Sequence, residues 1–164
     1  VSKISDLHTK ILDTRKTTPG LRHFEKDAVR IGGGQNHRMG LYDMMMIKDN
    51  HTDYAGGIAA AIERAHLYQK QNGLNIPIEV EARNMNEVEQ ILKTGKANRI
   101  MLDNFNYEQT REAVQVIDKQ CETESSGGIT LETVRPYAEC GVDFVSVGAL
   151  THQIQSLDMS LKAI

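Results

Sequence analysis

Residues 76–105 read IPIEVEARNMNEVEQILKTGKANRIMLDNF, and they contain a complete strand–helix–strand unit. Aliphatic residues dominate the run over 76–80, and Ile100-Met101-Leu102 form a second short apolar run. Between these runs, residues 86–95 repeat apolar side chains at helical spacing, with Asn86 as the expected N-cap. Two short apolar runs separated by one amphipathic helix are typical of a βαβ unit with parallel strands.

The same alternation extends through the rest of the chain. Further short apolar runs lie at Ile11-Leu12, 44–47 and 144–147, and a weaker one lies at 121–124. Further amphipathic stretches lie at 56–73, 107–119 and 130–141. Strands that alternate with helices predict an α/β protein with a parallel, barrel-like sheet, formed by residues 1–164 as one domain. Pro136 lies inside the last amphipathic stretch, so we expect that helix to be kinked or to start late.

Composition and charge exclude several classes of protein. The net charge of −3 gives no general positive surface for nucleic acid or membrane, so neither is an expected partner. No apolar run approaches the roughly 20 residues that span a bilayer, and the first residues, VSKISDLHTK, lack the apolar segment of a secretory signal. Cys121 and Cys140 lie far apart, which disfavours a disulfide framework and a cysteine zinc site. We therefore expect a cytoplasmic protein.

Charged, polar or glycine residues follow every predicted strand. In strand order they are Arg15-Lys16, Lys48 to His51, Glu81, Asp103-Asn104, Ser125 to Gly128, and Gly148. The carboxyl ends of barrel strands meet on one face, where α/β barrels carry their active sites. We therefore expect these side chains to form one site.

The cations of this site come early in the chain. The candidates are Arg15, Lys16, His37, Arg38 and Lys48. Arginine binds carboxylate or phosphate through a planar fork and lysine through a point charge, so the group predicts a multiply anionic ligand. Lys10, Lys26 and Arg30, by contrast, are expected to be solvated surface charges.

Carboxylates and glycines complete the predicted site. Glu81 and Asp103 end neighbouring strands, where they are suited to hold Mg²⁺ or sugar hydroxyls. Backbone N–H groups at Ser126-Gly127-Gly128 and Gly148 are suited to bind phosphate. The scattered histidines are expected to be hydrogen-bonding residues rather than metal ligands: His37, His51 and His152. These residues indicate an enzyme that binds a phosphorylated sugar, a second anionic substrate and Mg²⁺.

Six ordered motifs also carry a family resemblance. They are LDTRKTTPGLR (12–22), VRIGGGQNHRMGLYDMMMIKDNH (29–51), EVEARN (79–84), IMLDNF (100–105), ESSGGIT (124–130) and GVDFVSVGALTH (141–152). Together they resemble the quinolinate phosphoribosyltransferase family, also called carboxylating nicotinate-nucleotide pyrophosphorylase. The resemblance implies an open or incomplete TIM-like α/β barrel and transfer of phosphoribose from phosphoribosyl pyrophosphate to quinolinate. The products are nicotinate mononucleotide, pyrophosphate and CO₂, in de novo NAD biosynthesis.

The resemblance also implies roles for single residues. Arg15, His37, Arg38 and Lys48 would bind the two carboxylates of quinolinate. Lys16, Glu81 and Asp103 would be catalytic, with Lys16 near pyrophosphate and the two carboxylates at the ribose hydroxyls and Mg²⁺. Ser126, Gly127, Gly128, Gly148 and His152 would hold the 5-phosphate. The glycine run at 32–34 would let the chain turn so that His37 and Arg38 point into the dicarboxylate pocket.

The resemblance further implies a homo-oligomer, a dimer or a hexamer, in which the site is completed by a neighbouring subunit. Family members carry an N-terminal α/β sandwich domain that is not among these residues, so we expect the isolated chain to be weakly active or inactive. Three alternatives stay open: an enzyme of the same superfamily that uses nicotinate, a related molybdenum-system paralogue, and a barrel module without catalytic activity.

Overall fold

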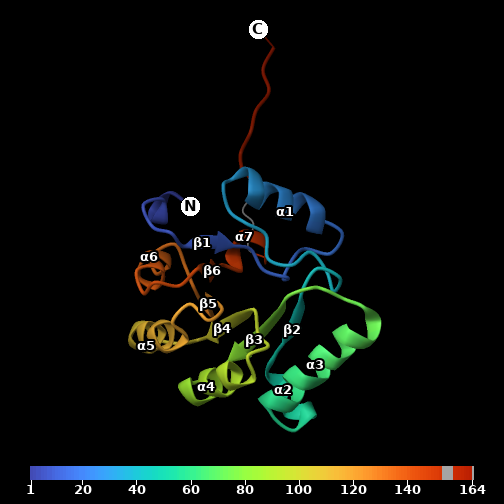
Figure 1. The fold of residues 1–164 in the computed structure, drawn as a ribbon. Coiled ribbons are helices and arrows are strands. Elements are labelled where there is room, and N and C mark those ends of the chain that lie inside the picture. Colours follow the sequence, from blue (N-terminus) through green and yellow to red (C-terminus); the bar gives the residue numbers. More distant parts are fainter. Residues whose placement is uncertain (153–156, 164) are drawn as a thin grey trace.

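The computed structural model describes residues 1–152 and 157–163, and it contains one six-stranded parallel sheet (Figure 1). The strands are β1 (Lys10–Leu12), β2 (Met45–Ile47), β3 (Ile78–Ala82), β4 (Arg99–Asp103), β5 (Glu122–Ser126) and β6 (Phe144–Ser146). Their order across the sheet is β1-β6-β5-β4-β3-β2. The two edge strands, β1 and β2, do not pair, so the predicted open α/β barrel is confirmed.

Eight helices connect these strands in the described part of the chain. They are η1 (Ser2–Ile4, a 3-10 helix), α1 (Arg22–Ile31), α2 (Asp49–Ala55), α3 (Ile58–Asn72), α4 (Met85–Thr94), α5 (Tyr107–Ile117), α6 (Val134–Ala138) and α7 (Ala149–His152). Helices α3 to α6 confirm the four predicted amphipathic stretches, and α6 starts late, as Pro136 predicts. Within the described ranges, no helix is long and apolar enough to cross a membrane.

The apolar core lies between the sheet and the helices on its outer side (Figure 1). Val80 of β3 and Ile100 of β4 are fully buried there against helix residues such as Ile62 and Val88. The opposite side chains of the same strands point into the barrel, and all of them except Met101 are charged. The strand register aligns Glu79 with Arg99, and Arg99 with Glu122.

Two sequence predictions about single residues are wrong. Asn84 rather than Asn86 is the N-cap of α4, since the Asn84 side chain accepts a hydrogen bond from the Glu87 N–H. Lys26 is not a surface charge: it is completely buried, and its Nζ lies 2.7 Å from Asp13 Oδ1. Both members of this ion pair are shielded from water, so each supplies the partner that the other needs.

Candidate active site

A cleft of about 970 Å³ opens at the carboxyl ends of the strands. Every predicted site residue except Arg38 lines it: Arg15, Lys16, His37, Lys48, Glu81, Asp103, Ser126, Gly127, Gly128, Gly148 and His152. The strand ends therefore meet as parallel strands require, and they bring cations, carboxylates and glycine loops together. The role of each residue stays a prediction.

Arg38 lines an adjoining cavity of about 640 Å³, and Arg15 lines both spaces. Arg38 Nη1 donates a hydrogen bond to the Met44 carbonyl at 2.9 Å. Burial, and then the positive charge of Arg15, lowers the pKa of Arg38 from its usual value. Two cations that repel each other in a partly buried space favour an anion between them.

Lys48 and Glu81, which were predicted to contact different substrates, form an ion pair in the structure. Lys48 follows β2, Glu81 lies near the end of β3, and their Nζ and Oε2 atoms are 2.9 Å apart. Asp103, at the end of β4, accepts a hydrogen bond from the Asn104 side chain at 2.8 Å. Glu81 and Asp103 thus present two carboxylates from neighbouring strands to one cleft. This donor set fits Mg²⁺, which takes one or two protein carboxylates together with phosphate oxygens and water.

The loop after β5 requires glycine at position 127. Gly127 has a φ of +104°, and a Cβ there would overlap the Asn104 side chain and lie 2.9 Å from the Asn104 backbone nitrogen. Asn104 itself has a positive φ of 56°, and its N–H donates to the Ser126 carbonyl at 2.8 Å. The β4 and β5 loops are therefore interlocked, which fixes the carboxylate of Asp103 beside the predicted phosphate loop.

Thr151 connects the segment after β6 to the loop after β1, which carries Arg15 and Lys16. The sequence did not predict this role of Thr151. The Thr151 hydroxyl is fully buried and donates to the Lys16 carbonyl at 2.7 Å. The His152 ring packs over Gly148, where a Cβ would lie 2.6 Å from its Nε2. Two loops far apart in the sequence are thus held together at the cleft.

The glycine run turns the chain as predicted, at the end of α1. Gly33 has a φ of +85°, and a Cβ on Gly34 would lie only 2.9 Å from the Val29 side chain. After this turn Gln35 pairs with β1, and the His37 ring enters the barrel. After the run, His37 lines the larger cleft and Arg38 lines the adjoining cavity, and Arg15 lines both.

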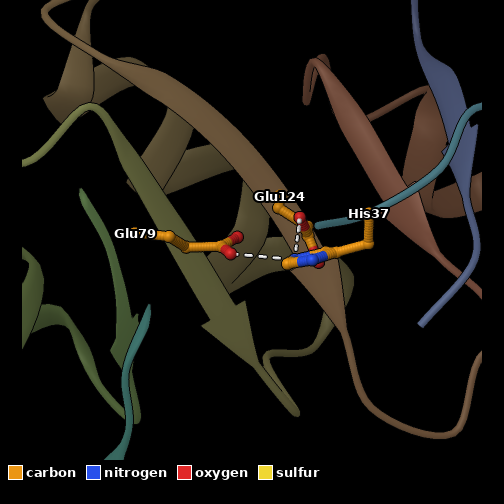
Figure 2. Close-up of side chains that lie close together, drawn as sticks. All are labelled: His37, Glu79 and Glu124. Atoms are coloured by element: carbon orange, nitrogen blue, oxygen red, sulfur yellow. Dashed lines mark ion pairs between the residues drawn. The ribbon is translucent and has the colours of Figure 1, made fainter. Parts of the chain in front are cut away.

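Inside the barrel, at the wall of the cleft, His37 lies between two buried glutamates (Figure 2). Its Nε2 is 2.8 Å from Glu79 Oε2 on β3 and 3.6 Å from Glu124 Oε2 on β5. Arg99 Nη1 donates to Glu124 at 3.2 Å. We call His37, Glu79, Glu124 and Arg99 the interior cluster. The sequence analysis did not predict Arg99 or Glu124 as site residues. Arg99 alternates with apolar residues in β4, and Glu124 alternates with Thr123 in β5, which places both side chains on the barrel side.

Burial controls the protonation of the interior cluster. It raises the pKa of Glu124 to about 8, helped by the negative charge of Glu79. It also raises the pKa of Glu79 and lowers the pKa of His37. Near neutral pH the cluster therefore holds a neutral imidazole and a protonated carboxyl group.

The open parallel sheet, with a cleft at the carboxyl ends of its strands, places the molecule among the α/β-barrel proteins that carry their sites on strand-end loops. The family model described as quinolinate phosphoribosyl transferase, C-terminal domain, matches residues 1–162, and the chain belongs to this family.

Known proteins agree with this assignment. The chain is 48% identical to a carboxylating nicotinate-nucleotide pyrophosphorylase of Arabidopsis thaliana, over 93% of the chain and 48% of that protein. It is 44% identical to a probable enzyme of the same name in Bacillus subtilis, over 96% of the chain and 53% of that protein. The structure of NadC from Streptococcus pyogenes superposes with a TM-score of 0.91 and 41% identity, covering 99% of this chain and 55% of that one. The chain thus spans about half the length of the curated relatives it matches.

Proposed function

We propose that the chain carries the catalytic cleft of a quinolinate phosphoribosyltransferase, which makes nicotinate mononucleotide, pyrophosphate and CO₂ in NAD biosynthesis. The observation that supports this most is the meeting of three chemically different strand-end groups in one cleft: cations, paired carboxylates and glycine loops. The names of the relatives, nicotinate-nucleotide pyrophosphorylase and quinolinate phosphoribosyltransferase, point to the same reaction.

The acceptor end of the cleft suits a dicarboxylate. Arg15 lines both cavities, Arg38 lies in the second, and Lys48 stands at the rim of the first. Arginine forks bind carboxylates in two-point contacts, so two arginines and a lysine match quinolinate better than nicotinate, which has one carboxylate. His37 also lines the first cleft, and we propose it as a further contact to a quinolinate carboxylate.

The donor end suits phosphoribosyl pyrophosphate. Glu81 and Asp103 would hold the ribose hydroxyls and Mg²⁺, which supplies charge neutralisation for the departing pyrophosphate when bound. Lys16 would stabilise the same leaving group. The backbone N–H groups of Gly127, Gly128 and Gly148 would receive the 5-phosphate, with Ser126 and His152 beside them.

The reaction needs positioning more than covalent catalysis. The quinolinate nitrogen attacks the anomeric carbon as the bond to pyrophosphate breaks, and Glu81 and Asp103 stabilise the positive charge that develops on the ribose. The ring nitrogen becomes a pyridinium, and its positive charge stabilises the electron pair that stays on C2 when the 2-carboxylate departs as CO₂. A proton then replaces the carboxylate at C2, which completes nicotinate mononucleotide.

We propose two further properties of the whole protein, a homo-oligomer, either dimeric or hexameric, and a cytoplasmic location. Large apolar side chains such as Phe24 and Ile31, exposed on α1, support an assembly, since such groups are commonly covered in one. Plant relatives are named as chloroplastic or mitochondrial, so fractionation of the native host decides the location.

The test is a direct assay with Mg²⁺, phosphoribosyl pyrophosphate and either quinolinate or nicotinate, read by mass spectrometry for nicotinate mononucleotide. Calorimetric binding of each acid to the 164-residue chain separates recognition from turnover. Product or preferential binding with quinolinate supports the proposal. Product from nicotinate alone, or a folded protein that binds neither acid, contradicts it.

A further inference from the structure

Arg22, the first residue of α1, joins two loops at the acceptor end of the cleft. We call them the β1 loop, residues 14–21, and the Arg38 loop, residues 38–44. The guanidinium of Arg22 donates to acceptors in both loops: the Arg15 carbonyl at 2.9 Å, the Thr17 hydroxyl at 3.1 Å, the Arg38 carbonyl at 3.2 Å and the Met39 carbonyl at 2.8 Å. One side chain thus bridges two loops that the whole of α1 separates in the sequence.

The hydrogen bonds of Arg22 leave little of its guanidinium for a ligand. A guanidinium has five N–H donors, and the protein takes up four of those of Arg22: one on Nε, two on Nη1 and one on Nη2. Of the residues that the structure describes, Arg15 lines both the cleft and the adjoining cavity and Arg38 lines the cavity, but Arg22 lines neither. Arg22 therefore holds the backbone behind the two arginines rather than the ligand in front of them.

The position of Arg22 in the fold is electrostatically unfavourable. The N-terminal end of a helix carries a partial positive charge, so a cation in the first turn is disfavoured. Burial, and then the positive charges of Arg15 and Arg22, lowers the pKa of Arg38, so the three cations repel one another. An arginine that both its helix and its neighbours repel points to a role for its planar fork, which spans two loops.

The two loops have few other links near the adjoining cavity. Deeper in the molecule, Asp13 accepts the His37 N–H at 2.7 Å, and the Gln35 N–H donates to the Ile11 carbonyl at 2.8 Å. These contacts fix where the two loops begin. Within residues 1–152 and 157–163, Arg22 is the one side chain that hydrogen-bonds to both loops. Without it, the outer parts of the loops can separate while the sheet stays intact.

We propose that Arg22 is a positioning residue that sets the separation between Arg15 and Arg38, and with it the fit of a ligand that carries two adjacent carboxylates. The inference rests on the proposed function, in which both arginines bind quinolinate. A dicarboxylate needs its binding groups at a fixed separation, because a shift of about 1 Å in a bound group can reduce turnover by up to about a hundredfold. One anchor for both loops meets this need without occupying the pocket.

Steady-state kinetics of the native, full-length protein test the proposal. Arg22→Met removes the fork, and kcat/KM for quinolinate should fall at least about tenfold, as the loss of one hydrogen bond to a charged group would cause. The KM for phosphoribosyl pyrophosphate should change less than about twofold, because the Lys16 carbonyl stays bound to Thr151. Arg30→Met, on the same helix in an exposed pair with Asp27, is the matched control and should change neither value.

A lysine at the same position separates geometry from charge. Arg22→Lys keeps the positive charge, but its single nitrogen cannot reach both loops as the planar fork does. We therefore expect the quinolinate defect to persist in Arg22→Lys. Full recovery in this variant would mean that Arg22 acts through its charge alone, and it would overturn the proposal.

Hydrogen exchange read by mass spectrometry tests the coupling of the loops without any substrate. In Arg22→Met, backbone amides of the β1 loop and the Arg38 loop should exchange faster than in the wild-type protein, while those of β3 and β4 should not change. Unchanged exchange in the two loops contradicts the coupling. Faster exchange throughout the sheet would show a general loss of stability instead, and it also contradicts the positioning role.

The results separate this inference from the proposed function. If the wild-type protein makes no nicotinate mononucleotide, the proposed function fails, and the exchange data alone then decide whether Arg22 couples the two loops. If the wild-type protein is active and Arg22→Met affects both substrates alike, or neither, the positioning role fails while the proposed function stands. If Arg22→Met does not fold, Arg22→Lys carries both tests, since it too lacks the fork.

Discussion

Replacing Lys26 by methionine tests the buried ion pair that anchors the His37 segment. Lys26 Nζ contacts Asp13 Oδ1 at 2.7 Å and the His37 carbonyl at 2.9 Å, and the two side chains are 1% and 0% exposed. Breaking a buried pair by removing one partner costs about 3–5 kcal/mol. Asp13 keeps two donors, the His37 N–H and the Asn36 amide, so we expect about 3 kcal/mol, the low end of that range.

A loss of about 3 kcal/mol corresponds to a melting temperature lower by roughly 6–12 °C in a chain of this length. Urea unfolding followed by circular dichroism measures the free energy directly. Arg30→Met is the matched control, because Arg30 lies on the same helix in a pair with Asp27 whose side chains are 67% and 63% exposed. A Lys26→Met loss below about 1 kcal/mol, or one no larger than that of Arg30→Met, would refute the argument from burial.

Three further predictions concern the cleft. Gly127→Ala should raise the KM for phosphoribosyl pyrophosphate at least about tenfold in steady-state kinetics, because its Cβ would strike Asn104; an unchanged KM contradicts this role of the loop. Thr151→Val should also raise that KM, since the bond to the Lys16 carbonyl is lost, while Thr151→Ser should restore it. Burial raises the pKa of Glu124 from 4.5 to about 8, so the native state binds a proton more tightly and the free energy of unfolding should fall as pH rises between those values. Glu124→Gln should flatten this slope, which is at most about 1.4 kcal/mol per pH unit, in urea titrations across pH.

The sequence predicted the parts of the fold whose hydrophobic patterns are simple. Short apolar runs mark every strand except β5, which reads ETESS. Helices α3, α4 and α5 follow the helical period and end near Gly73, Gly95 and Asp118. Helix α1 escaped prediction because its buried face includes Glu25 and Lys26, which any hydropathy pattern counts as exposed. A helix that buries charge can be found only once its partners, here Asp13 and Thr18, are known.

The sequence predicted residues that meet in one cleft, but it did not predict the buried charges of the interior cluster. Strand ends can be predicted from sequence because polar residues follow apolar runs. All of the predicted site residues except Arg38 line the cleft. The interior cluster could not be predicted from the pattern of polar and apolar residues. The alternation in β3 suggests a strand with one solvated face, yet all five of its residues are buried. Glu79 is buried because residues from three other segments, His37, Arg99 and Glu124, surround it, and sequence spacing does not show that juxtaposition.

The charged interior also explains how an open barrel keeps its site in shape. Strands β1 and β2 do not pair, and the segment after the glycine run lies along β1 instead, where the Gln35 N–H donates to the Ile11 carbonyl at 2.8 Å. Lys26 and Asp13 hold the backbone of this segment through the carbonyl and the N–H of His37. Lys26→Met should therefore lower stability and quinolinate turnover together. A network that closes the gap between β1 and β2 in this way makes the geometry of Arg38 depend on the fold of the whole barrel.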